Sequence, residues 1–196
     1  MAALRFEGDV VGHLRAEALY QIDFPVMQRD NRFYLDHDAR GEPNAHGAAF
    51  LDEENVLDPR DDNLIVYAHN LSSGQMFGSL FRLGEPEGLA RSPFVYFATA
   101  QGSRTYVPVA MIRTSVGGED DFDFMRTRFA QAADKQAFLD EALRRSSLPM
   151  AAPCSAEDDL LTLATCSGRE GKARLVLLLR ALRQEENEAQ MRALFQ

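Results

Sequence analysis

Cysteine is scarce in this 196-residue sequence, which contains only Cys154 and Cys166. Two cysteines are too few for a disulfide framework, and their spacing matches no zinc-binding pattern. The four histidines, at positions 13, 37, 46 and 69, include no pair with HxxxH spacing. We therefore expect no metal site and no other cofactor.

The sequence also has no long run of apolar residues and no long run of basic residues. The longest uninterrupted apolar run, Leu175–Leu179, is far shorter than the roughly 20 residues of a membrane helix. The opening MAALRFEGDVVG lacks the regions of a signal peptide. The net charge of −9, without any run of four Lys or Arg residues, argues against nucleic acid as a partner, because phosphate binding needs a basic patch. These features predict a soluble chain.

The sequence does contain enough apolar material for one domain, since 45% of its residues are hydrophobic. Short β-rich runs with short connections recur along the chain, and no βαβ alternation interrupts them, which predicts a mixed barrel with peripheral helices. Strands are expected over residues 10–14, 22–27, 47–53, 64–70, 93–99 and 104–116, and two more flank the loop between Cys166 and Arg174.

Three segments have helical spacing. The clearest covers residues 133–147, with Asp134 as its N-cap and an apolar face made by Phe138, Leu139, Ala142 and Leu143. A short amphipathic helix is expected within residues 72–86, where Met76, Phe77, Leu80, Phe81 and Leu83 recur at helical spacing. The tail, residues 183–196, is a third helix candidate with a Glu188–Arg192 pair.

Three strand-end residues could form a reactive site. If the last two apolar runs form a hairpin, Cys166 leaves one strand where Arg174 enters its neighbour, about 4.8 Å away. A guanidinium there favours thiolate and can stabilise an oxyanion. His69 likewise ends a buried strand. Each residue also has an ordinary explanation: a buried inert thiol, a hydrogen-bonded histidine and a surface ion-pair arginine.

A family resemblance covers these same residues. The segment VYAHNLSSGQMFGSL (Val66–Leu80) resembles the class B sortase signature YGHNMxxGxMFGxL, and TLATC (Thr162–Cys166) resembles the sortase motif TLxTC. ARLV resembles the arginine strand that follows this motif in the family, while IDFPVMQRDNRFYLDHD and GAAFLDEEN resemble two earlier family segments. The likeness extends, in order, from about Asp9 to Leu182.

The resemblance implies a closed, mainly β, eight-stranded sortase barrel over residues 1–182, with residues 183–196 as a helical extension of the same domain. It implies Cys166 as nucleophile, His69 as general acid and base, and Arg174 as the group that holds the substrate backbone or the oxyanion. The loop 167–173 would be a wall of the peptide groove. Peptide contacts would come from Asn31, Leu35, Thr165, Phe124 and Met125.

The implied activity is that of a cysteine transpeptidase. Such an enzyme cleaves an LPxTG- or NPxTN-like sorting signal at the threonine carbonyl through a thioester. It then joins the surface protein to an amine of a cell-wall precursor or a pilin. The resemblance implies the outer face of a Gram-positive cytoplasmic membrane, reached through an N-terminal anchor that this chain lacks. A cysteine peptidase acting on the same peptides and a non-catalytic peptide-binding barrel are the alternatives.

Three departures from the family pattern leave the catalytic positions intact. Ala164 replaces a common serine, Ala68 replaces the glycine before the histidine, and His13 replaces a tryptophan. These differences concern the choice of sorting peptide more than the chemistry.

Overall fold

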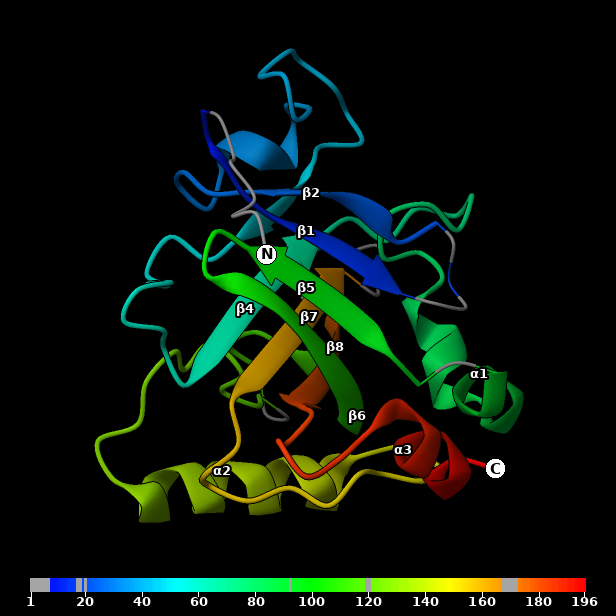
Figure 1. Ribbon diagram of the computed structural model, residues 1–196. Helices are drawn as coiled ribbons and strands as arrows, with labels where there is room; N and C mark the ends of the chain where they lie inside the picture. Colours follow the sequence, from blue (N-terminus) through cyan, green and yellow to red (C-terminus); the bar gives the residue numbers. More distant parts are fainter. Residues whose placement is uncertain (1–7, 17–18, 20, 92, 119–120, 167–172) are drawn as a thin grey trace.

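The computed structural model describes residues 8–16, 19, 21–91, 93–118, 121–166 and 173–196, with the backbone alone for Cys166. Eight strands close into a barrel in the order β1-β2-β3-β4-β7-β8-β6-β5, which confirms the expected architecture (Figure 1). The strands are β1 (Val10–Ala16), β2 (Asp23–Met27), β3 (Ala49–Leu51), β4 (Asn63–Ala68), β5 (Val95–Thr99), β6 (Gly102–Ser115), β7 (Leu160–Cys166) and β8 (Ala173–Ala181).

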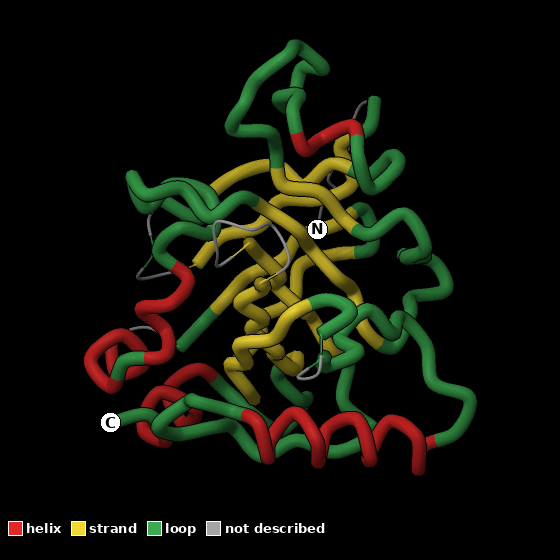
Figure 2. The backbone as a smooth tube through the Cα atoms, turned by 180° about the vertical axis from the view of Figure 1, so that it is seen from behind, coloured by secondary structure: helices red, strands yellow, loops and turns green. Residues whose placement is uncertain are grey.

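The helical elements lie outside the barrel. Figure 2 shows α2 (Ala132–Arg145) as a long helix crossing one end of the molecule, below the strands. The others are short: two 3₁₀ helices, η1 (Phe33–Leu35) and η2 (Leu80–Gly84), and two α-helices, α1 (Pro86–Arg91) and α3 (Glu188–Leu194).

Strands β4 and β7 are apolar on both faces because both faces are covered. Leu64, Val66, Leu161 and Leu163 belong to the cluster that fills the barrel. Alternate residues of the same strands face outward, where Ile65, Leu160 and Ala164 pack with Phe124, Val176 and residues of α2. This double burial explains the unbroken apolar runs in the sequence.

The prediction of an amphipathic helix within residues 72–86 is largely wrong. Gly74 has a φ of +83° and Met76 has a φ of +53°, so the chain turns where a helix was predicted. Helical structure begins at Leu80 in η2 and continues as α1, whose first residue is Pro86. Proline suits that position because its missing N–H and fixed φ cost nothing there.

The expected helix over residues 133–147 is present as α2, although two of its details are wrong. Its N-cap is Gln131, and Asp134 lies in the first turn instead. Phe138, Leu139 and Ala142 are buried as expected, whereas Leu143 is 39% exposed.

The tail forms α3 over a shorter range than predicted, and a capping box between Asn187 and Gln190 starts it. Met191 and Phe195 pack with Phe94 and Val107 of the barrel. Glu188 accepts hydrogen bonds from the hydroxyls of Tyr96 and Thr105, at 3.3 and 3.4 Å. The tail is thus packed on the barrel along β5 and β6.

Candidate active site

Strand register brings the three predicted catalytic positions to one end of the barrel. Strands β7 and β8 are antiparallel, and the backbone of Cys166 pairs directly with that of Arg174. Strands β4 and β7 are parallel, and Ala68 pairs with Thr165. His69 therefore follows β4 at the point where Cys166 ends β7. The side chain of Cys166 and residues 167–172 of the predicted groove wall lie outside the described residues.

A groove of about 250 Å³ opens at this end of the barrel. Both described catalytic candidates, His69 and Arg174, line it, and so do all five residues predicted to contact a peptide. Leu35 and Met125 are 44% and 45% exposed, whereas Phe124 and Thr165 are buried. The full lining is Asn31, Leu35, Phe50, Tyr67, Ala68, His69, Val116, Phe124, Met125, Ala164, Thr165 and Arg174.

The imidazole of His69 is held by a backbone carbonyl. Its Nε2 lies 2.7 Å from the carbonyl oxygen of Leu35, and that oxygen can only accept. Nε2 therefore carries a proton and donates it, which leaves Nδ1 as the nitrogen available for proton transfer. The backbone is fixed as well, because Phe77 N–H donates to the His69 carbonyl at 2.9 Å.

Arg174 is a permanent cation that lines the groove. Its Nη1 donates to the carbonyl of Ala173 at 3.0 Å, which orients the guanidinium at the start of β8. Burial raises the pKa of Tyr67 well above its usual range, and the neighbouring Asp52 carboxylate adds to this, while the positive charge of Arg174 acts in the opposite direction. Tyr67 is accordingly a neutral phenol beside a permanent cation.

Two aromatic residues of the groove escaped the sequence-based prediction. The rings of Tyr67 and Phe50 lie 5.3 Å apart, and Phe124 meets Tyr67 edge-on at 6.5 Å. The Tyr67 hydroxyl donates to Asp52 at 2.9 Å. Strand alternation gave a usable signal, because Tyr67 precedes His69 by two residues and so shares its face.

Ala164 has a clear packing environment. It is 1% exposed and belongs to the outer cluster with Ile65, Phe124 and Val176. A serine there would place a hydroxyl in this apolar cluster, where an unmade hydrogen bond is costly. The alanine thus matches the apolar wall of this particular groove.

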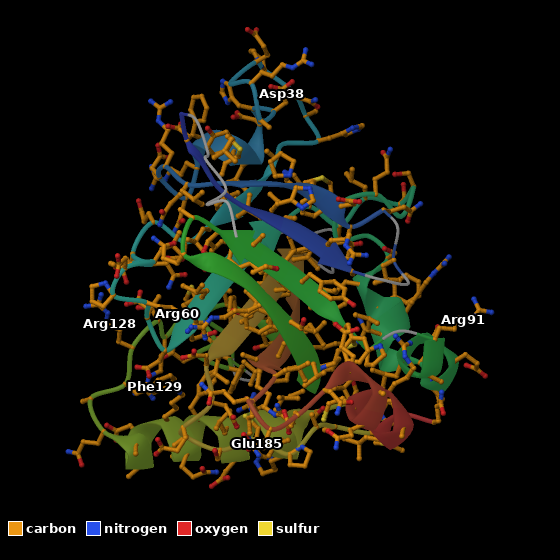
Figure 3. All side chains as sticks on the ribbon, viewed as in Figure 1. Asp38, Arg60, Arg91, Arg128, Phe129 and Glu185 are labelled. Atoms are coloured by element: carbon orange, nitrogen blue, oxygen red, sulfur yellow. The ribbon has the colours of Figure 1, made fainter. Side chains whose placement is uncertain are left out.

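The loop that follows η1 projects from the barrel, with Asp38 near its tip (Figure 3). It ends next to His69 at Gly47, before β3. Within the described parts of the chain, no group of three or more His, Cys, Asp or Glu side chains is arranged to hold a metal ion. None of the described helices is long and apolar enough to cross a bilayer.

The chain is similar to several known proteins that are named sortase B. Sortase B of Listeria monocytogenes is 28% identical over 160 residues, which cover 80% of this chain and 63% of the relative. Sortase B of Staphylococcus aureus is 26% identical over 159 residues, covering 81% and 63%. The S. aureus sortase B–substrate complex superposes with a TM-score of 0.82 at 25% identity, over 90% of this chain and 81% of that one.

The chain is similar to the class B sortases in both sequence and fold. No family model matches it, so this likeness is carried by these relatives and by the barrel. The chain spans about 63% of the length of the curated relatives it matches.

Proposed function

We propose that this chain is a class B sortase and acts as a cysteine transpeptidase. It would cleave an LPxTG- or NPxTN-like sorting signal at the threonine carbonyl and transfer the surface protein to an amine of a cell-wall precursor or a pilin. The observation that carries the proposal is that His69 and Arg174 line one groove with the five predicted peptide contacts. The backbone of Cys166 pairs with that of Arg174 at the same end of the barrel.

The reaction would proceed in two displacements. The thiolate of Cys166 attacks the threonine carbonyl, a C–S bond forms, and the peptide C–N bond breaks as His69 donates a proton from Nδ1 to the departing amine. The incoming amine then attacks the thioester and passes its proton to His69, and the C–S bond breaks to restore the thiolate. Arg174 stabilises the oxyanion in both steps.

The proposal also includes the cellular location of the protein and the bounds of its catalytic domain. We infer action at the outer surface of a Gram-positive cell, since the two curated relatives come from Listeria and Staphylococcus. We also infer that residues 1–182 form the catalytic domain and that residues 183–196 extend it.

The test is a product analysis with two acceptor conditions. Sorting peptides of both types are incubated with the protein, with and without a short glycine peptide as amine, and the products are identified by mass spectrometry. Transpeptidation predicts an amine-linked product, which Cys166→Ala abolishes. Hydrolysis regardless of acceptor would indicate a peptidase, and the absence of any thioester with either peptide would indicate a binding module.

A further inference from the structure

Asp52 lies directly behind the groove and is nearly buried, at 5% exposure. One oxygen of its carboxylate, Oδ2, accepts hydrogen bonds from Asn31 Nδ2 at 3.1 Å and from the Tyr67 hydroxyl at 2.9 Å. The other oxygen accepts from the backbone N–H of Glu54 at 2.9 Å. A single buried carboxylate thus joins two side chains that line the groove.

Asn31 is oriented at both ends of its amide. Its Nδ2 donates to Asp52, and its Oδ1 accepts from the backbone N–H of Glu53 at 2.9 Å. The amide therefore presents a fixed pattern of remaining donor and acceptor sites to the groove.

The segment that contains Asn31 also contacts His69. Asn31 is followed within a few residues by η1, whose last residue, Leu35, supplies the carbonyl that accepts from His69. Asp30 stiffens the intervening turn, because its carboxylate accepts from the N–H groups of Arg32 and Phe33, both at 3.0 Å. Fixing Asn31 therefore helps to fix the acceptor of His69.

Tyr67 carries the second connection. Its hydroxyl is held by Asp52, its ring packs on Phe50 and Phe124, and it lies two residues before His69 and close to Arg174. Losing the acceptor would free this ring in the middle of the groove.

We propose that Asp52 is a positioning residue for the sorting peptide, acting through Asn31 and Tyr67 without touching substrate. The role rests on the proposed function. A carboxylate suits the position because it offers only acceptors to the three donors around it. An asparagine would turn one acceptor into a donor and leave one of those donors without a partner.

The turn that holds Asp52 does not depend on its carboxylate. Its backbone N–H donates to the Ile65 carbonyl at 2.8 Å, and its own carbonyl accepts from Gln28 Nε2 and from Asn55 N–H, at 2.9 and 3.0 Å. We therefore expect Asp52→Asn to fold.

The experiment compares Asp52→Asn with Asp158→Asn. Asp158 is a carboxyl of similar burial that accepts from Arg183, and it does not line the groove. We expect Asp52→Asn to lower kcat/KM for a sorting peptide about 10- to 100-fold, mostly through a higher KM, whereas Asp158→Asn lowers stability and leaves kcat/KM unchanged. Adding Tyr67→Phe to Asp52→Asn should cause less loss than Tyr67→Phe causes alone.

Two outcomes would overturn the role. One is an Asp52→Asn variant with unchanged kcat/KM, and the other is a decrease in kcat/KM that Asp158→Asn shows to the same extent. If the wild type turns over no sorting peptide, the proposed function fails instead. The role of Asp52 is then read from binding of labelled LPxTG- and NPxTN-type peptides to Cys166→Ala. Weaker binding after adding Asp52→Asn supports the role, while equal or absent binding rejects it.

Discussion

At the scale of single residues, Gly47 shows how tightly the groove is built around His69. Its φ is +58°, which L side chains rarely adopt. A Cβ at this position would collide with the carbonyl oxygen of Tyr34 and would lie 2.9 Å from that of Leu35 and 3.1 Å from His69 Cδ2. The Leu35 oxygen is the acceptor that orients His69.

We expect Gly47→Ala to lose stability and activity together. The strained backbone costs about 1–3 kcal/mol, and displacement of the Leu35 carbonyl should lower kcat about tenfold or more. Gly41→Ala is the matched control, because Gly41 has a φ of +79° but its Cβ would meet only Phe33 Cζ, at 4.0 Å. Thermal melts and turnover of both variants check this. Equal activity in the two would show that the close approach does not matter.

Arg174 gives a second test at this scale. A lysine keeps the charge but loses the planar fork that binds backbone and oxyanion together. We expect Arg174→Lys to keep the melting temperature and to lose about 10²-fold in kcat. Arg144→Lys, in an exposed pair with Glu141, serves as control. Near-normal turnover of Arg174→Lys would refute the assigned role.

The two thiols should differ in reactivity. Burial raises the pKa of Cys154 to about 12, and the nearby Asp158 charge adds to this. A thiol with that pKa has almost no thiolate at neutral pH, so we expect iodoacetamide to label Cys166 and spare Cys154. Peptide mapping by mass spectrometry at pH 7 measures both sites. Faster labelling of Cys154 would contradict the assignment of Cys166 as nucleophile.

At the scale of elements, β8 and the tail are joined by a buried ion pair. Arg180 is fully buried and makes two bonds to the Glu186 carboxylate, at 2.6 and 2.7 Å, while its Nε donates to the Pro153 carbonyl at 2.6 Å. Glu186 of the tail therefore neutralises the positive charge of Arg180, which β8 places in the protein interior.

We expect Glu186→Gln to destabilise the protein by about 3 kcal/mol, because it leaves the Arg180 charge buried and uncompensated. Glu141→Gln is the control, since Glu141 pairs with arginines on the exposed face of α2, and its melting temperature should hardly change. Denaturant titration gives both values. A similar small effect in the two variants would mean that the tail pair contributes little.

The strands and helices also show which parts of the fold the sequence predicts and which it does not. The apolar runs of β4 and β7 predicted strands correctly because both faces are buried and no competing period exists. The helix predicted within residues 72–86 is largely wrong because their apolar spacing fits a helix, whereas Gly74 and Met76 adopt left-handed φ values. Phe77, Leu80 and Leu83 are nevertheless all buried in the cluster that fills the barrel, because a turn followed by η2 brings them there. Periodicity alone does not distinguish this arrangement from a continuous helix.

At the scale of the whole molecule, the groove is assembled from segments spread between Asn31 and Arg174. The family motifs identified His69, Cys166 and Arg174 in the sequence. The register of the barrel strands explains why these three positions lie at the same end of the barrel. The Asp52–Tyr67–Asn31 network had no such signal. It depends on the pairing of β3 with β4, which sets Asp52 beside Tyr67, and on the segment before η1, which brings Asn31 to the same carboxylate.

Acid stability is likewise a property of the whole fold. Burial of Asp158 opposes its ionisation, but the bonds from Arg183, the N–H of Ser155 and the charges of Arg183 and Arg180 together outweigh it and hold its pKa below the usual value of 3.8. Glu186 follows the same balance with Arg180, below a usual value of 4.5. Between the usual and the lowered pKa, the unfolded chain binds more protons than the folded one.

The free energy of unfolding should therefore hold its full contribution from these carboxyls above about pH 4.5. It should fall as the pH drops through the lowered pKa values, by at most about 1.4 kcal/mol per pH unit for each group. Urea titrations between pH 7 and pH 2.5 measure this slope. Asp158→Asn removes one of the two groups, so its stability should start lower and decline less steeply in acid; a decline parallel to the wild type would show that Asp158 is not one of the groups responsible.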